Sequence, residues 1–183
     1  MKFEDLMLDR AETVAEQAAL LNNRLIALRR TNRQEIINTF DREEHRLEHV
    51  TWVGGVKFIN DSKSCTPNAT YYSFEKVKNE LVWIAGGNNS KIDYSDLIGQ
   101  ISRRVNTLVC IGKDNRKLFE TFSGIITDIV EEQDMEEAVM RAYYAAKNND
   151  AGTVLLSTAC EPDELYPNYQ ARGNEFKKAI AQL

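Results

Sequence analysis

The stretch NDSKSCTPN, residues 60–68, groups side chains that could bind an anion. Asp61, a serine and Lys63 follow an apolar run, while Thr66 and Pro67 have the residue types of a helix N-cap and first helical position. A carboxylate, a hydroxyl and an ammonium beside the N–H groups of a helix start could bind a phosphate or a metal-nucleotide. The same residues could equally form a solvated turn in which Asp61 satisfies local amides.

Two later turns also follow apolar runs. In GGNNSKIDY, Gly86 and Gly87 permit positive φ and close approach of a ligand, although paired glycines are also ordinary in turns. In STACEPDELY, the acidic residues and Pro162 make a poor site for an anionic substrate. Cys160 is interpreted as buried filler rather than as a nucleophile, because nothing beside it resembles a catalytic triad.

Several kinds of chemistry are excluded or disfavoured by the sequence. No GxxxxGK[ST] stretch occurs, so a P-loop for ATP phosphates is not encoded. His45 and His49 lie four apart without the acidic ligand set of a metal helix, and no metal site is predicted. The cysteines are odd in number and lack CxxC spacing, which argues against a disulfide framework or a zinc site and fits a reducing cytoplasm: Cys65, Cys110 and Cys160.

Composition narrows the possible partners. The chain has 183 residues, a size that suits one compact domain with an appended element. Its formal net charge of -5, without a concentrated basic block, argues against nucleic acid or an anionic membrane as partner. The N-terminal residues alternate charged and apolar types, so neither a signal peptide nor a membrane span is predicted there. We expect a cytoplasmic protein.

Strand-like and helix-like patterns alternate beyond residue 50. This alternation predicts an α/β fold: a mostly parallel six-stranded sheet with helices on both faces. Ligands of such sheets bind where strand carboxyl ends meet the next helix, which singles out the three turns above. The predicted strands are 51–53, 56–60, 81–85, 107–112, 124–130 and 153–157, and the predicted helices are 67–77, 94–105, 115–122, 135–147 and 169–183.

The first 40 residues have a different pattern. Apolar or small residues from Met7 to Leu28 recur at alternating steps of four and three, which is a heptad-like stripe. The stripe could cover the chain's own body or bind a protein partner or a second copy through Val14, Leu21, Leu25 and Leu28. A shorter helix is expected up to Phe40. We therefore predict an N-terminal helical segment over residues 1–40 and an α/β domain over residues 41–183.

The order of several segments resembles a known family. EHRLE followed by NDSK, then VCIGKDNRKL, MEEAVMRAYYAA, TVLLSTAC and NYQARGNEFKKAI, is similar to the C-terminal domain of Mur ligases, closest to the D-glutamate-adding members. The resemblance covers about residues 40–183 and implies a Rossmann-like domain. It implies ATP-dependent ligation in the full enzyme, in which a carboxylate activated as an acyl phosphate is attacked by an amino acid, with Mg²⁺ stabilising the charge. It places Arg46, Asp61 and Lys63 at nucleotide-facing positions.

The resemblance breaks at the amino-acid pocket. Cys65 stands where the family usually has threonine, and Pro162 stands where it usually has serine. Ser90 replaces the family's glutamate-facing lysine, so that only Lys91, one place along, could compensate. Each lost hydrogen bond to a charged group costs roughly 1.5–3 kcal/mol. Three such losses predict a degraded glutamate pocket.

Together these features predict a protein that is not catalytic alone. A full ligase also carries a nucleotide-sugar domain and an ATPase domain, which the printed chain does not show. We expect a binding or structural subunit with no cofactor in isolation, and with ATP and Mg²⁺ only if a partner supplies the P-loop. Two alternatives stay open: a component that completes a ligase active site in trans, and a piece excised from a larger ligase.

Overall fold

A computed structural model describes residues 43–86, 91–149, 151–162 and 164–183 of the chain. The predicted N-terminal helices, with the stripe residues Val14, Leu21, Leu25 and Leu28, lie outside the described residues. Ser90 lies outside them as well. No helix within the described part is both long enough and apolar enough to cross a membrane.

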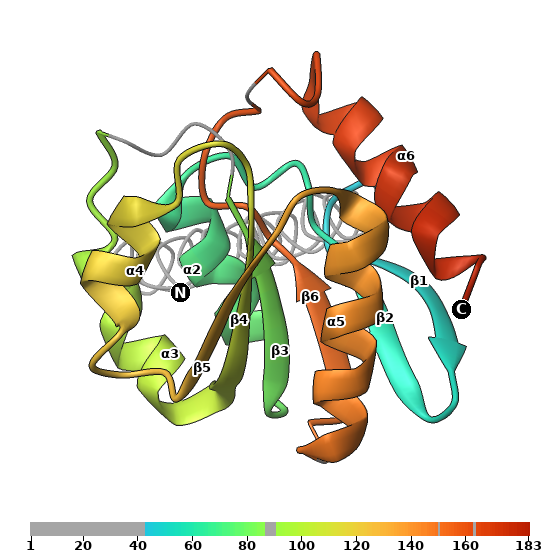
Figure 1. The fold of residues 1–183 in the computed structure, drawn as a ribbon, viewed down its shortest axis with the longest axis horizontal. Helices are drawn as coiled ribbons and strands as arrows, with labels where there is room; N and C mark the ends of the chain where they lie inside the picture. Colours follow the sequence, from blue (N-terminus) through green and yellow to red (C-terminus); the bar gives the residue numbers. More distant parts are fainter. Residues whose placement is uncertain (1–42, 87–90, 150, 163) are drawn as a thin grey trace, which may run out of the picture. The chain divides into compact units, whose positions relative to one another are not determined.

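Six strands form one sheet in the order β1-β2-β6-β3-β4-β5 (Figure 1). β1 pairs with β2 in antiparallel fashion at the edge, and the other neighbouring strands pair in parallel. The mostly parallel six-stranded sheet is therefore confirmed. The bounds are β1 Glu48–Val53, β2 Val56–Asn60, β3 Leu81–Ala85, β4 Val105–Ile111, β5 Asp128–Glu132 and β6 Thr153–Leu156.

Helices cover both faces of the sheet, as the sequence predicted. On one face α5 and α6 pack against Phe58, Val154 and their neighbours. On the other, α2, η1, α3 and α4 enclose Trp83, whose ring lies edge-on to Phe74 at 5.3 Å and to Phe122 at 5.6 Å between ring centroids. The bounds are α2 Pro67–Lys76, the 3₁₀ helix η1 Ser95–Leu97, α3 Ile98–Arg104, α4 Arg116–Phe122, α5 Met135–Asn148 and α6 Tyr169–Ile180.

Two predicted elements differ from the structure. The segment 124–130 was predicted as a strand from its isoleucines, but β5 begins only at Asp128, and the backbone N–H groups of Ile125 and Ile126 donate to Phe122 O. Ile126 is buried in the core as part of the turn after α4, so its apolar character reports burial and not a strand. The predicted helix 94–105 is divided into η1 and α3, and Val105 already belongs to β4.

At β6 the helix that follows the strand packs on the opposite face from the helices that follow β2 and β3. Strands β2, β3 and β4 are followed by helices on one face, whereas β6 lies between β2 and β3 and is followed by α6 on the opposite face. Neighbouring connections that leave to opposite faces define the topological switch point at which open α/β sheets bind ligands. The three turns singled out in the sequence leave the sheet at this point.

Candidate functional site

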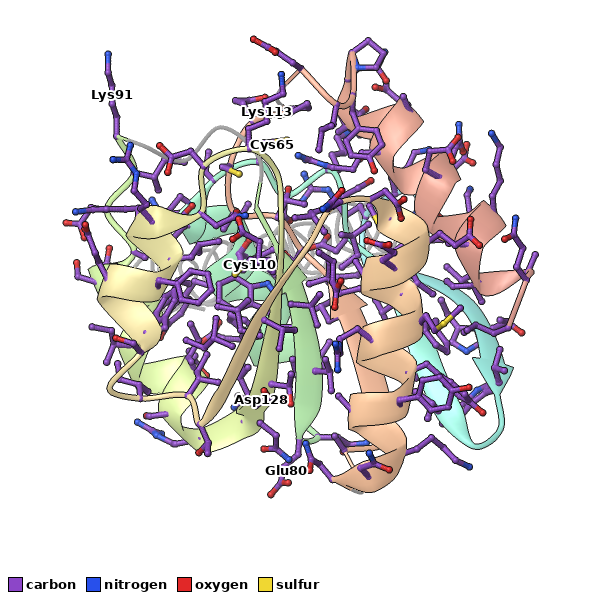
Figure 2. All side chains as sticks on the ribbon, in the orientation of Figure 1. Cys65, Glu80, Lys91, Cys110, Lys113 and Asp128 are labelled. Atoms are coloured by element: carbon purple, nitrogen blue, oxygen red, sulfur yellow. The ribbon has the colours of Figure 1, made fainter. Side chains whose placement is uncertain are left out.

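The site is built from three turns at the carboxyl ends of adjacent strands. The first turn, residues 61–66, follows β2, the second, residues 86–91, follows β3, and the third, residues 157–162, follows β6. Backbone hydrogen bonds join them: Ala159 N donates to Ser64 O at 3.0 Å, and Gly86 N donates to Thr158 O at 3.3 Å. Figure 2 shows Cys65 and Lys91 at this end of the sheet, opposite Glu80 and Asp128.

The start of α2 explains the shape of the first turn. Thr66 is the N-cap, with its side chain accepting a hydrogen bond from Ala69 N at 3.2 Å, and Pro67 is the first helical residue. Both predicted positions are confirmed. The first helical turn of α2 contains no acidic side chain, so no carboxylate of its own offsets the partial positive charge of the helix N-terminus.

Asp61 points into the protein and is fully buried. Its carboxylate accepts hydrogen bonds from Ser73 Oγ at 2.5 Å, Ser157 Oγ at 2.8 Å and Leu47 N at 3.1 Å. Burial raises the pKa of the Asp61 carboxyl, and the surrounding hydroxyls oppose that change. In the described part of the chain Asp61 thus joins β2, α2, β6 and the segment before β1; its role toward a nucleotide stays a prediction.

Lys63 and Arg46 lie beside one carboxylate. Lys63 Nζ pairs with Glu43, and Arg46 Nε lies 3.6 Å from Glu43 Oε2. The Lys63 ammonium also sits 5.7 Å from the centre of the Tyr169 ring. The hydrogen bond from Lys63 lowers the pKa of Glu43. The structure therefore gathers two of the three predicted nucleotide-facing residues as a partly exposed cationic pair at the edge of the first turn.

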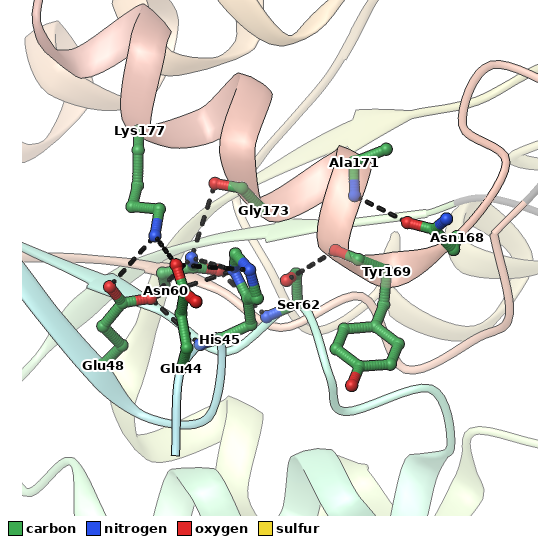
Figure 3. Close-up of polar contacts among 10 residues, drawn as sticks. All are labelled: Glu44, His45, Glu48, Asn60, Ser62, Asn168, Tyr169, Ala171, Gly173 and Lys177. Atoms are coloured by element: carbon green, nitrogen blue, oxygen red, sulfur yellow. Dashed lines mark hydrogen bonds and ion pairs between the residues drawn. The ribbon is translucent and has the colours of Figure 1, made fainter. Parts of the chain in front are cut away.

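The segments EHRLE and NDSK are bonded to each other through a polar network (Figure 3). Asn60 Nδ2 contacts His45 Nδ1 at 2.9 Å and donates to Glu48 Oε2 at 3.1 Å. Lys63 N donates to His45 O at 3.0 Å. Lys177 of α6 closes the network by pairing with Glu48. The joint occurrence of the two segments in the sequence thus has a structural reason.

The acidic part of this network is already paired with a lysine. Ligand atoms of Glu44, His45 and Glu48 lie within 4.8 Å of one another, a spacing that a metal ion could use. Lys177 Nζ, however, lies 2.6 Å from Glu44 Oε1 and 3.2 Å from Glu48 Oε1. An ammonium in that position supplies the positive charge that a cation would bring.

His45 is buried, and its backbone has a φ of 65°, which is unusual for a residue with a side chain. Burial lowers the pKa of His45, the charge of Lys177 adds to this, and Glu44 and Glu48 oppose it. The folded protein therefore holds His45 neutral at a pH where the unfolded chain, with a pKa of about 6.5, begins to take up a proton.

We expect stability to decline as the pH falls below about 6.5, because the unfolded state then binds more protons than the folded state. Urea unfolding at about pH 7.5 and about pH 5.5 measures this decline. His45→Gln should flatten it, while His49→Gln, at the exposed second histidine, should preserve it. Equal pH dependence in all three proteins would show that His45 does not control stability in this range.

Three of the four residues predicted for the altered amino-acid pocket are described by the structure: Cys65, Lys91 and Pro162. Cys65 is half-buried, and burial raises the pKa of its thiol, so it is not an activated nucleophile. Pro162 is partly buried at the end of the third turn, and Lys91 is exposed. Ser90 belongs to the undescribed part of the second turn, so the convergence of all predicted pocket residues is untested.

Sequence reasoning missed two residues of α6 that hold the site together. Arg172 is buried and donates to Ser62 O at 2.9 Å, which links α6 to the first turn. Gly173 lies so close to the polar network that a Cβ atom there would meet His45 Nδ1 at 2.3 Å. A glycine inside a helix pattern was the available signal, since glycine there often indicates close approach of another segment.

Two hollows in the described surface are lined by residues outside the three turns. One of about 520 Å³ lies between α5 and α6 and is lined by Met135, Tyr166 and Ala179, among others. Another of about 480 Å³ lies at the carboxyl ends of β4 and β5, beside Lys113 and Asn115. Neither contains the first-turn residues, so volume alone does not identify the site.

The fold is an α/β domain in which the three turns meet at the switch point of a mostly parallel sheet. The family model for the glutamate ligase domain of Mur ligases matches residues 45–160. The chain therefore belongs to the Mur ligase family, as the resemblance had indicated.

Individual relatives agree with this assignment. The chain is 39% identical over 166 residues to a UDP-N-acetylmuramoylalanine–D-glutamate ligase of Christiangramia forsetii, covering 91% of the chain and 37% of the relative. It is 37% identical over 173 residues to the enzyme of the same name from Porphyromonas gingivalis, covering 94% of the chain and 36% of that relative. The chain thus spans little more than a third of these relatives.

A solved structure supports the fold. The chain resembles MurF from Acinetobacter baumannii with a TM-score of 0.51 and 15% identity, covering 77% of this chain and 30% of that one. At this identity the likeness concerns the fold alone.

Proposed function

We propose that this chain is a Mur ligase C-terminal domain that does not catalyse alone and acts as a binding or structural subunit. The observation that carries the proposal is the composition of the amino-acid side of the site. At the positions where the family usually has hydroxyls, the chain has the protonated thiol of Cys65 and the side chain of Pro162, which has no hydrogen-bond donor. Exposed Glu161 adds negative charge to the same turn.

A second candidate is a component that completes an ATP-dependent ligase active site supplied by another polypeptide or domain. The cationic pair of Arg46 and Lys63 at the edge of the first turn favours it, because arginine and lysine side chains bind phosphate groups. In this role the nucleotide and Mg²⁺ would be held largely by the partner. The substrates named for the relatives, UDP-N-acetylmuramoylalanine and D-glutamate, are the first to test.

A reconstitution experiment separates the two functions. The chain is mixed with the Christiangramia forsetii ligase from which the matching C-terminal region has been removed, and phosphate release is measured with ATP and both substrates. A binding or structural subunit is expected to associate without restoring turnover, and glutamate substitutions at Leu21 and Leu25 should weaken that association. An assembly that survives these substitutions would count against the N-terminal stripe as its interface.

The ligase component predicts a different result. Turnover should appear on mixing and fall by about 100-fold or more in Lys63→Ala, since oriented cations stabilise charge in phosphoryl transfer. Lys78→Ala removes an exposed lysine outside the three turns and should leave turnover unchanged. Restored turnover that is indifferent to Lys63 would contradict the proposed role of the cationic pair.

A further inference from the structure

β5 is an edge of the sheet with backbone groups available to another strand. It spans Asp128–Glu132 and pairs in parallel with β4, and within the described residues no strand pairs with its other side. Ile129 packs against the cluster that includes α4, and Val130 packs against the cluster that includes α5, so the strand is held on both faces (Figure 1). An edge strand held in this way presents a row of N–H and C=O groups to an added strand.

A hollow lies beside β5 on each face of the sheet. The hollow on the α5 face measures about 270 Å³ and is lined by Glu132, Glu137, Met140, Arg141 and Tyr144. Met140 is 46% exposed and Tyr144 is 58% exposed, so both offer apolar surface to a ligand. The hollow on the α4 face is the one of about 480 Å³, which includes Glu131 and Phe119. Successive side chains of an added strand point to opposite faces, so neighbouring side chains would enter different hollows.

The charge of this edge selects the kind of partner. Residues 128–137, which form β5 and the start of α5, contain six acidic residues and no basic one. Among the described residues, Arg141 is the one cation that forms an ion pair with this stretch, at 2.9 Å from Glu132. Two copies of the chain joined through β5 would place these carboxylates against one another, and like charges on paired strands are destabilising. A partner strand that carries lysine or arginine would instead be attracted.

We infer that the free edge of β5 binds an extended, basic segment of another protein by β-strand addition. The backbone of the segment extends the sheet, and its alternate side chains enter the two hollows. On the α5 face, the stem of a lysine or arginine packs on Met140 and Tyr144 while its cationic end approaches Glu137. On the α4 face, an apolar side chain packs on Phe119. The inference goes beyond the proposed function, because it uses neither the three turns nor the N-terminal stripe.

Two model peptides test the charge and the place of binding. One capped peptide of about six residues, the length of an ordinary strand, alternates lysine and valine, and the other alternates glutamate and valine. Each is added to the full, isotope-labelled chain, and the backbone amide signals are followed by NMR. The lysine peptide is expected to bind at least about tenfold more tightly than the glutamate peptide and to shift the signals of β5. Equal binding of the two peptides, or shifts concentrated at the other edge strand, β1, would overturn the inference.

Methylation of the peptide backbone separates strand addition from simple charge attraction. Two further versions of the lysine peptide carry N-methyl groups, one version on its lysines and the other on its valines, with all side chains unchanged. Alternate residues of an added strand direct their N–H groups to opposite edges, so only one of these sets faces β5. One version should therefore lose about tenfold or more in affinity, while the other binds nearly as before. Equal affinity of the two versions, whether kept or lost, would show that no strand is added.

Substitutions in the chain locate the contacts on the α5 face. Glu137→Lys is expected to weaken binding of the lysine peptide about tenfold. Glu136→Lys is the matched control, because it reverses the same charge one residue along, at an exposed side chain that does not line the hollow on the α5 face. An effect of Glu137→Lys no larger than that of Glu136→Lys would contradict the inference.

Tyr144→Ala adds a test that leaves the charge of the edge unchanged. It should weaken binding about threefold, through loss of contact between the cation and the ring, whereas Tyr71→Ala, at an exposed tyrosine of α2, should have no effect. Signals of β5 that shift with the concentration of the chain alone would identify a second copy as the occupant and overturn the inference. The titrations contain no ATP and no ligase substrate, so their outcome is independent of the reconstitution.

Discussion

Replacing Asp61 with alanine is expected to lower the free energy of unfolding by about 3 kcal/mol, because several buried groups lose their acceptor at once. The carboxylate accepts hydrogen bonds from the backbone N–H of Leu47 and from the hydroxyls of Ser73 and Ser157. Urea unfolding measures the loss. Asp114→Ala is the control: its carboxylate pairs with Arg116 at the surface, and its removal should leave the midpoint nearly unchanged.

Asparagine at this position adds a sharper test. Asp61→Asn keeps an oxygen that accepts from Leu47 N, and its NH₂ group can donate to the oxygens of the two hydroxyls. The loss of unfolding free energy should therefore be smaller than for alanine. Burial raises the pKa of Asp61, which means that the folded state holds its proton more firmly than the unfolded state. Stability from this group therefore falls as the pH rises from about 4 toward the folded pKa.

The raised pKa of Asp61 predicts how the stability of Asp61→Asn compares with that of wild type at different pH values. Asparagine does not ionise, so Asp61→Asn should become more favourable relative to wild type as the pH rises from about 4 to about 7. A difference between the two proteins that is constant over this range would contradict the raised pKa. A loss in Asp61→Ala no larger than in Asp114→Ala would refute the structural role of the carboxylate.

This role bears on how the resemblance to Mur ligases is interpreted. Asp61 was expected to face a nucleotide, yet in the described residues its carboxylate faces the inside of the domain. Its bond to Leu47 N and the bond of Lys63 N to His45 O join the two most specific segments of the family pattern. Their presence together is explained by the folding of this domain alone. A nucleotide-facing role for these segments stays a prediction.

Local sequence signals predicted the architecture well where one physical rule decided it. The run LVWIA became the fully buried strand β3, because only an element covered on both faces accommodates five apolar residues in a row. Thr66 and Pro67 predicted the start of α2 through capping chemistry. The rule that ligands bind at strand carboxyl ends then selected the three turns that the structure brings together.

Long-range contacts were beyond such rules. Arg172 lies 110 residues from Ser62 in the chain, and no local pattern indicates that the two are bonded. The isoleucines at 125 and 126 likewise gave a strand signal, although their burial depends on the turn that follows α4. The direction of a side chain at the site, such as that of Asp61, is fixed by partners from distant parts of the chain. Hydrophobic periodicity does not predict it.

Gly173→Ala is expected to destabilise the protein by about 1–3 kcal/mol, the usual cost of forcing extra atoms into a packed site. A Cβ atom at this position would lie 2.3 Å from His45 Nδ1 and 2.4 Å from Ser62 Oγ. Neither neighbour can retreat freely, since His45 is buried against Asn60 and Ser62 Oγ donates to Tyr169 O. Alanine is the better helix former by about 1 kcal/mol, so the expected sign opposes intrinsic propensity.

Gly99→Ala provides the opposite expectation within the same protein. Gly99 lies in α3. Apart from its chain neighbours and the backbone of its own helix, no atom lies within 4 Å of an added Cβ. Alanine there should stabilise by about 0.5–1 kcal/mol through helix propensity and a less flexible unfolded chain. Urea unfolding of both variants decides the matter. Stabilisation by Gly173→Ala would mean that α6 does not approach the first turn as closely as described. The hydrogen bond from the neighbouring Arg172 to Ser62 O would then be in doubt as well.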